Sequence, residues 1–512
     1  MDLNLAIVVL YLVAMLAFGF WGRSRTKNSS DYLVAGRRLG YFLYTGTMAA
    51  VVLGGASTVG GVGLGYKMGL SGMWLVVAIG VGVLLLSLLF AGTIQKLRVY
   101  SVSEMLDLRY GHKATGASSI VMLAYTIFLS VTSTGAYATV LHVLLGWDRW
   151  LCIVVGGGVV LVYSVIGGMW SITLADQVQF IIKTIGIFAL MLPFTLSKAG
   201  GFDGIRERMG DQAFNLVGDK NFGADPQTIL TWFVVFTLGL LIGQDIWQRV
   251  FTARSPEVAR WGGAAAGIYC IFYGAAGAVI GMAAHASLGD KIKVKDDVYA
   301  EVADKILPVG IGGLVLAAAV AVAAMVSTAS GALIAAATVA RNDVVPMITG
   351  KAKATGESAE DPHSDKNIRE NRTWVLGLGI VIIAIAAWMS SLKAGGDIVV
   401  ASLTIAYDIL VGGLLIAILG GFVWKRGNGQ GAAASMIVGT VVTLGTMAVL
   451  AVQLGDPLLG ILDNRPIYFG LLASLVTFVA VSLATKPVRP EVREEWDARV
   501  SGRIETEGVR TS

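Results

Sequence analysis

Charged side chains are scarce in this sequence of 512 residues. Asp, Glu, Lys and Arg make up 14% of the chain, whereas an ordinary soluble domain is about 25% charged. Hydrophobic residues reach 55%, and many of them stand in runs of the roughly 20 residues that a helix needs to cross a bilayer. These proportions exclude a soluble globular protein and indicate an integral membrane protein.

Cysteine and histidine are also rare, and their scarcity argues against several kinds of site. The two cysteines, Cys152 and Cys270, fall inside hydrophobic runs, which is typical of buried thiols and not of a disulfide framework. The four histidines form no cluster with cysteine, so we expect no transition-metal site. No nucleophile–base pair appears either, so we expect no enzyme. The basic residues lie in loops between apolar runs, so we expect no nucleic-acid partner.

The apolar runs predict an all-α membrane protein with about thirteen transmembrane helices. Residues 1–485 are expected to form one transmembrane domain, and residues 486–512 a cytoplasmic tail. We number the spans from 0 to 12. The predicted spans are 3–21, 42–66, 73–95, 114–145, 150–168, 175–197, 228–250, 259–286, 307–340, 373–391, 397–423, 431–453 and 466–485.

The charges around the first span predict its orientation. Asp2 precedes the span, while Arg23, Arg25 and Lys27 follow it. A signal peptide would carry its positive charges before the apolar run, so this segment is interpreted as a retained helix. Basic residues concentrate in the loops on the same side as Arg23, as the positive-inside rule requires of cytoplasmic loops. We therefore expect a multi-pass protein of the inner (plasma) cell membrane, with its amino terminus outside and its carboxyl terminus cytoplasmic.

Glycine is abundant, at 65 residues, and most glycines are expected to allow close helix packing. The span 42–66 is unusual because six of them crowd its second half, from Gly54 to Gly65, together with Ser57 and Thr58. Each glycine costs about 1 kcal/mol in a helix relative to alanine. We therefore predict a broken helix around Ala56–Val59, whose freed backbone oxygens could bind an ion or a substrate. The alternative is a packing notch for a neighbouring helix. In an inverted repeat, a matching break is expected in the span 228–250.

Polar side chains inside predicted spans are candidates for function. Ala324, Ser327 and Thr328 share one helix face and offer the hard oxygen ligands that suit a monovalent cation. Alternatively, the hydroxyls bond back to their own helix. Asp176 could cap a helix or bind a cation. Lys183 lies about two turns further along the same face, and its ammonium could pair with Asp176, meet a substrate carboxylate or lose its proton.

Four ordered motifs resemble those of the sodium/solute symporter family. They are residues 31–38 (DYLVAGRR), 167–177, 248–253 and 325–330 (MVSTAS). The second motif departs from the family pattern at Ser171 and Ala175. The resemblance covers about residues 3–480 and implies a LeuT-like fold of two inverted five-helix repeats. It places the repeats at about 42–197 and 228–423, with one extra helix in front at 3–21 and two behind at 431–453 and 466–485.

The resemblance also implies Na⁺ as the coupling ion and a set of ligands for it. The main sodium site would consist of the backbone oxygens of Ala56, Val59 and Ala324 and the hydroxyls of Ser327 and Thr328. Some members of the family bind a second sodium ion through the aspartate of the fifth core helix. Here that site would use Asp176, Ser327 and Ser330, although Gly331 stands where a further serine can occur.

By the same resemblance, the substrate lies between the two broken helices. Thr58 and Gln244 are the positions carried over from the family. A quaternary ammonium such as choline favours an aromatic cage. The positions where the family would place these aromatic residues are Thr58 and Gly243 here, and neither is aromatic, so choline is disfavoured. Lys183 instead favours a carboxylate-bearing solute such as an organic acid or an amino acid.

The predicted function is therefore sodium-coupled symport of a small polar organic solute into the cell by alternating access. Its partners would be the solute, sodium ions and the lipid bilayer, with the oligomeric state left open. Two alternatives remain from the sequence. One is a proton-coupled symporter in which Lys183 or Asp176 titrates. The other is a transporter-like solute sensor, although the tail after Lys486 is too short for a signalling domain.

Overall fold

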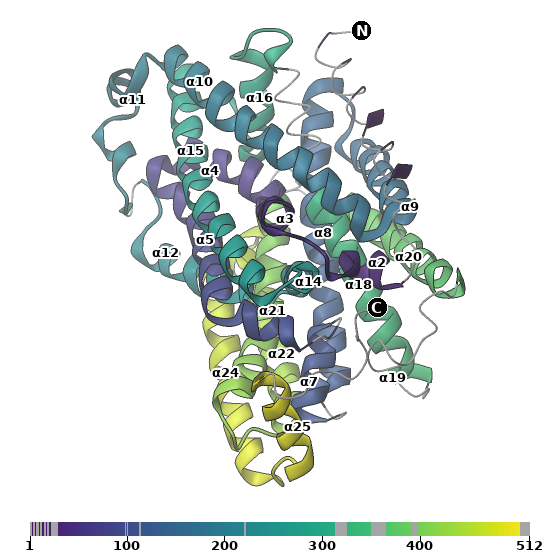
Figure 1. Ribbon diagram of the computed structural model, residues 1–512. Helices are drawn as coiled ribbons and strands as arrows, with labels where there is room; N and C mark the ends of the chain where they lie inside the picture. Colours follow the sequence, from purple (N-terminus) through teal and green to yellow (C-terminus); the bar gives the residue numbers. More distant parts are fainter. Residues whose placement is uncertain are drawn as a thin grey trace.

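The computed structural model describes residues 29–501 apart from 98, 100, 112–113, 220–221, 313–324, 350–364 and 392–397, together with scattered positions between 3 and 21. Regular structure in this part of the chain is helical, and one isolated bridge joins Leu39 to Ala253. Figure 1 shows the helices packed against one another in one bundle. The predicted all-α class is confirmed.

The helices follow one another with short connections. In the first half of the chain they are α2 (Ser29–Val34), α3 (Tyr41–Val52), α4 (Gly61–Met68), α5 (Trp74–Leu85), α6 (Ala91–Lys96), α7 (Val102–Tyr110), α8 (Thr115–Leu145), α9 (Arg149–Thr184), α10 (Leu192–Ala199), α11 (Gly201–Met209), α12 (Pro226–Trp232), α13 (Leu238–Leu240) and α14 (Gln244–Thr252). In the second half they are α15 (Gly263–Leu288), α16 (Val298–Lys305), α18 (Met325–Val339), α19 (Val345–Thr349), α20 (Asp365–Ser390), α21 (Ile398–Val423), α22 (Gly429–Leu454), α23 (Pro457–Leu462), α24 (Arg465–Ala484) and α25 (Pro490–Ser501).

Within the described residues, ten helices are long and apolar enough to cross a membrane, and a bent pair raises the number to eleven. The predicted count of thirteen is therefore not confirmed. The two spans that differ have separate explanations. The predicted span 3–21 lies mostly outside the described residues. The predicted span 42–66 is divided, because α3 is too short to cross alone and the segment Ala56–Lys96 continues into the next predicted span.

The first glycine-rich span is broken, as predicted, but at a different place. α3 ends at Val52, and Leu53 and Gly54 leave the helix before a π-helical turn, Ala56–Gly60, leads into α4. The chain therefore leaves the helix just before the predicted segment Ala56–Val59, which itself lies in the π-helical turn. The reason is tertiary, since a Cβ atom on Gly54 would come 3.0 Å from Oγ1 of Thr328 in α18. The break lies where another helix touches the backbone.

A second break divides the span that includes residues 226–252. The helical segment that runs from α12 through α13 ends at Leu240, and α14 begins at Gln244 after a bend of 45°. Gly243 has an extended backbone, with φ −66° and ψ 131°. The matching break expected in the span 228–250 is confirmed. Both breaks lie in the interior of the bundle, because the residues around them are buried.

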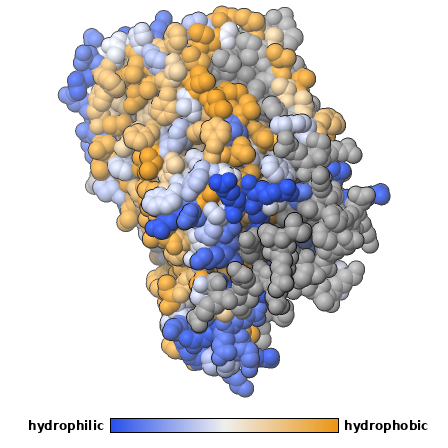
Figure 2. Space-filling view, viewed as in Figure 1, coloured by the Kyte–Doolittle hydropathy of each residue, from blue (hydrophilic) through white to orange (hydrophobic). Residues whose placement is uncertain are grey.

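The outer surface carries the signature of a protein in lipid. Large apolar side chains are exposed on many helices, which a soluble monomer avoids; examples are Phe42, Leu230, Phe272, Trp388 and Val441. Figure 2 shows apolar side chains over much of the upper part of the molecule and hydrophilic ones gathered at the lower end, where α25 lies. Trp496 of α25 is buried, and its ring lies 5.4 Å from that of Phe422. The predicted tail therefore begins with a helix that packs against the bundle.

Candidate functional site

The end of α3 is the first element of the site. The last carbonyl groups of a helix have no partner within the helix and must find one elsewhere. Here the Thr328 hydroxyl donates a hydrogen bond of 2.6 Å to the carbonyl oxygen of Val51. The Lys183 ammonium donates to the oxygens of Leu53 and Ala50, at 2.8 and 3.3 Å. Two other helices, α9 and α18, thus satisfy the broken end of α3 with polar side chains.

Lys183 is almost completely buried, with 1% of its surface exposed. Its position at the carboxyl end of α3 is electrostatically favourable, because that end of a helix carries partial negative charge. The sequence left three alternatives for Lys183: pairing with Asp176, binding a substrate carboxylate, or loss of its proton. The structure shows hydrogen bonds from its ammonium to backbone oxygens instead. The Lys183 side chain is therefore bound to the end of α3 at the break.

Asp176 lies in a different environment. Its carboxylate pairs with the Arg249 guanidinium of α14 at 3.3 Å and accepts a hydrogen bond from Thr47 of α3. Both charged side chains are buried, at 0% and 1% exposed, so each needs the other to offset the cost of desolvation. Gly331 contributes space, because a Cβ atom there would come 3.1 Å from Nη2 of Arg249. Gly331, which stands where a further serine can occur in the second sodium site, thus lies beside Arg249.

Arg249 was overlooked as a site residue, although the sequence contained a signal for it. It belongs to the Gln248-Arg249 motif that supported the family resemblance. Ser330, the other predicted ligand of a second sodium ion, is buried in α18. The structure therefore brings Asp176 next to a resident positive charge.

The predicted ligands of the main sodium site are only partly brought together. Ala324 lies outside the described residues, and the side chain of Ser327 is also not described. Thr328 faces the end of α3. Ala56 and Val59 lie beyond the break, in the π-helical turn and next to α4. The backbone oxygen that accepts a hydrogen bond from Thr328 belongs to Val51, which is not among the predicted ligands.

A small cavity lies between the two breaks. Asp245, in the first turn of α14, faces it, and its carboxylate accepts a hydrogen bond of 2.7 Å from the Tyr125 hydroxyl. Its walls include residues from the junction between α3 and α4 and from the helices α8, α18 and α21. The lining residues are Val51, Val52, Gly54, Gly55, Ala56, Ser57, Ile79, Leu129, Thr132, Ser133, Asp245, Ile246, Thr328, Leu403 and Tyr407.

None of the three predicted substrate residues lines this cavity. Thr58 shares a hydrogen bond of 2.9 Å with the Tyr273 hydroxyl, and the Gln244 side chain accepts one of 2.7 Å from the backbone N–H of Val102. Lys183 is bound to the end of α3. Asp245 was not singled out as a ligand, although it directly follows Gln244 in the predicted break. Asp245 lines the cavity and Gln244 does not, and this difference is visible only in the structure.

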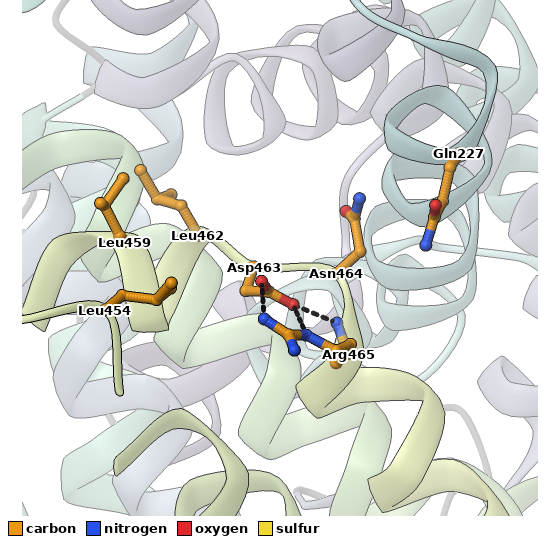
Figure 3. Close-up of a pocket in the computed structure, with 7 residues that line it drawn as sticks. All are labelled: Gln227, Leu454, Leu459, Leu462, Asp463, Asn464 and Arg465. Atoms are coloured by element: carbon orange, nitrogen blue, oxygen red, sulfur yellow. Dashed lines mark hydrogen bonds and ion pairs between the residues drawn. The ribbon is translucent and has the colours of Figure 1, made fainter. Parts of the chain in front are cut away.

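A second pocket opens on the surface, between the start of α12 and the loop that joins α23 to α24 (Figure 3). Asp463 and Arg465 in this loop pair with each other at 2.8 Å. Their charges are therefore mutually satisfied and exposed to solvent. This pocket has neither a buried ionisable group nor a helix break, so the cavity at the breaks is the better candidate site.

Comparison with known proteins decides the family. The model of the sodium:solute symporter family matches residues 32–439. The chain belongs to this family. It is 24% identical to sodium/glucose cotransporter 4 of Danio rerio, with 97% of this chain and 81% of the relative covered. It is 25% identical to sodium/myo-inositol cotransporter 2 of Mus musculus, with 97% and 79% covered.

A solved structure supports the fold of this symporter. The chain resembles a sodium-coupled sialic acid symporter in a substrate-bound, outward-open state, with a TM-score of 0.74 and 18% identity. The match covers 96% of this chain and 99% of the other. The predicted LeuT-like fold, the family resemblance and Na⁺ as the coupling ion are confirmed. The chain is a multi-pass, sodium-coupled symporter.

Proposed function

We propose that this symporter imports a small polar organic solute across the plasma membrane by alternating access. The supporting observation is the cavity between the two broken helices, since discontinuous helices are the usual place of substrate and ion binding in such transporters. The names of the relatives describe carriers of glucose and myo-inositol, which are polar organic solutes. We further propose that the amino terminus is outside and the carboxyl terminus cytoplasmic, as the distribution of basic loops predicts.

We propose that sodium binds where α3 ends and α18 begins. Thr328 already contacts a backbone oxygen there, and Ser327 and Ala324 precede it by one and four residues in the sequence. The backbone ligands proposed are the oxygens at the end of α3, among them that of Val51. The sequence-based ligands Ala56 and Val59 remain alternatives that adjoin the same break.

A second sodium ion at Asp176 and Ser330 is less well supported. The Arg249 guanidinium pairs with the Asp176 carboxylate in a buried setting, and it supplies the positive charge that a sodium ion would bring. We therefore propose one sodium ion per transport cycle at the α3–α18 junction. Each positive charge moving down a potential of 100 mV releases about 2.3 kcal/mol, which supports appreciable accumulation of solute.

The test is the sodium dependence of thermal stability, measured on the purified full-length protein in NaCl and in KCl at equal ionic strength. A ligand that binds only the folded state raises stability by mass action, so we expect a higher melting temperature in NaCl. The variant Thr328→Val should weaken the sodium response. Thr443→Val is the matched control, because the Thr443 hydroxyl is also buried but bonds to Gly439 of its own helix. An equal response in both salts would contradict the proposal.

A further inference from the structure

The cavity between the breaks has one carboxyl side chain and no basic side chain among the residues that line it. Asp245 is 3% exposed and lies in the first turn of α14, directly after the extended Gly243. The other polar side chains of the wall are the hydroxyls of Ser57, Thr132, Ser133, Thr328 and Tyr407. The chemistry of the cavity is therefore one carboxylate with neutral hydroxyl groups around it.

Asp245 forms no direct ion pair with a basic residue in the part of the chain that the structure describes, and the basic side chain that acts on its charge is Arg249, one turn further along α14. Two buried basic side chains near the breaks have direct partners elsewhere: Arg249 of the same helix pairs with Asp176, and Lys183 of α9 binds the end of α3. The segment 313–324, which precedes α18, contains no charged residue in its sequence. An ionised carboxylate in a buried site is costly unless a cation accompanies it.

Two tyrosines lie next to the same carboxylate, which accepts a hydrogen bond from Tyr125 and shares the cavity wall with Tyr407. The Tyr125 hydroxyl binds it, and the Tyr407 ring lies 5.6 Å from that of Tyr125 in an edge-on arrangement. The ring of Phe236 is 5.3 Å from that of Tyr407. Gly243 makes this arrangement possible, since a Cβ atom there would come 3.0 Å from both the Asp245 carboxylate and the Tyr125 hydroxyl. A cavity whose wall holds both a carboxylate and the ring of Tyr407 suits an organic cation.

We infer that the solute carried by this symporter bears an ammonium group, which binds the Asp245 carboxylate in the cavity between the breaks. This inference rests on the proposed function and specifies its substrate class. It reverses the preference for a carboxylate-bearing solute that Lys183 suggested from the sequence, because Lys183 does not reach the cavity. A solute with a net negative charge would face Asp245 without a counter-charge, whereas an ammonium group neutralises it and can donate hydrogen bonds to it.

The test uses matched probes that differ in charge. The amines are ethanolamine, propanolamine and putrescine, and the uncharged partners are ethylene glycol, propanediol and butanediol, in which hydroxyl replaces ammonium. Glycolate and lactate serve as anions. Their binding to the purified full-length protein is measured in NaCl by thermal stabilisation and by isothermal titration. We expect at least one amine to bind, and its diol partner to bind at least about tenfold more weakly.

The variant Asp245→Asn should weaken amine binding about tenfold or more, and should leave the sodium concentration for half-maximal stabilisation within about twofold. Tyr125→Phe, which keeps the ring and removes one hydrogen bond to the carboxylate, should weaken amine binding less. Asp408→Asn is the matched control, because Asp408 is also a buried carboxyl of a core helix and does not line the cavity. It should leave amine binding unchanged.

Three results would overturn the inference. The first is the failure of every amine to bind while the sodium response is intact. The second is binding of diols or anions as tightly as their amine partners. The third is an Asp245→Asn variant whose sodium midpoint moves while its amine affinity does not, since Asp245 would then be a sodium ligand. A protein that does not respond to sodium would contradict the proposed function. In that case the amines and their diol partners are compared in KCl, and that comparison tests this inference separately.

Discussion

Lys183 shows how a buried charge can serve the backbone. A lysine in the interior of a membrane protein is costly, and here the cost is offset by two carbonyl oxygens at the end of a broken helix. The same helix end is where we propose that sodium binds. On this proposal, the ammonium and the sodium ion would be neighbours that bind adjacent oxygens of one helix end. We therefore expect the response of the protein to sodium to depend on a residue outside the ion's own ligands.

The variant Lys183→Met should separate the two cations. Without the ammonium, the oxygens of Ala50 and Leu53 lose their partner, which should lower the free energy of unfolding in sodium-free buffer by about 1–3 kcal/mol. Sodium can then bind those oxygens, so the gain in melting temperature on adding NaCl should exceed that of the wild type. Thermal unfolding in KCl and NaCl measures both quantities.

The control for this comparison is Lys198→Met, since Lys198 is an exposed lysine at the end of α10. It should change neither value. An unchanged stability of Lys183→Met in KCl would show that the hydrogen bonds to the end of α3 contribute nothing.

At the scale of elements, the two breaks are the parts that depart from regular helix. Glycine at position 54 lets α18 approach the end of α3, and the loss of regular hydrogen bonding is made good by side chains from other helices. A π-helical turn follows at once, which is a feature often found at functional sites. The first break is thus an arrangement of several helices, and its geometry should be sensitive to small additions of volume.

The variant Gly54→Ala tests this sensitivity. Its Cβ atom would come 3.0 Å from the Thr328 hydroxyl, so α3 and α18 must move apart, at a cost of about 1–3 kcal/mol in the free energy of unfolding. The sodium concentration for half-maximal stabilisation should rise. In the control Gly158→Ala in α9, the added methyl group meets no atom within 4 Å, and stability should be equal to or above that of the wild type. Similar sodium midpoints in the two variants would contradict the proposed junction.

At the scale of the whole molecule, an ion pair joins distant segments on the side that we propose to be outside. Arg149, at the start of α9, holds Asp297, next to α16, through contacts of 2.7 and 2.8 Å. Burial raises the pKa of the Asp297 carboxyl, and Arg149 opposes that rise. On the opposite side, α25 packs its Trp496 against Phe422 at the end of α21. These contacts place the loop before α16 and the helical tail at opposite ends of the bundle.

The proposed orientation can be tested with reporter fusions in a bacterial host. Green fluorescent protein fused after Ser512 should fluoresce, because it folds in the cytoplasm. Alkaline phosphatase fused after Gly455, in the loop between α22 and α23, should be active, because that loop is proposed to lie outside. The reciprocal fusions should be inactive. Active phosphatase at the carboxyl terminus would reverse the orientation, and with it the assignment of every loop.

The sequence by itself determined the membrane class, the helical fold and the existence of the two breaks. These depend on local properties: runs of apolar residues, the density of glycine and the placement of basic loops. The count of spans was less secure, since a span that is broken and then merges with its neighbour has no clear boundary in composition. The family motifs were also legible, because they are short and continuous segments.

Only the tertiary structure decided what the polar residues of the site do. Lys183 reaches Leu53 across 130 residues of sequence, and Thr328 reaches Val51 across 277, so no local pattern could assign these partners. Asp176 and Lys183 share a helix face, yet one meets an arginine and the other a set of backbone oxygens. Asp245 became a candidate ligand for the solute only because the packing of distant helices places it in the wall of the cavity. Side-chain identity determines which interactions a buried charge needs, and the packing of distant helices determines which group supplies them.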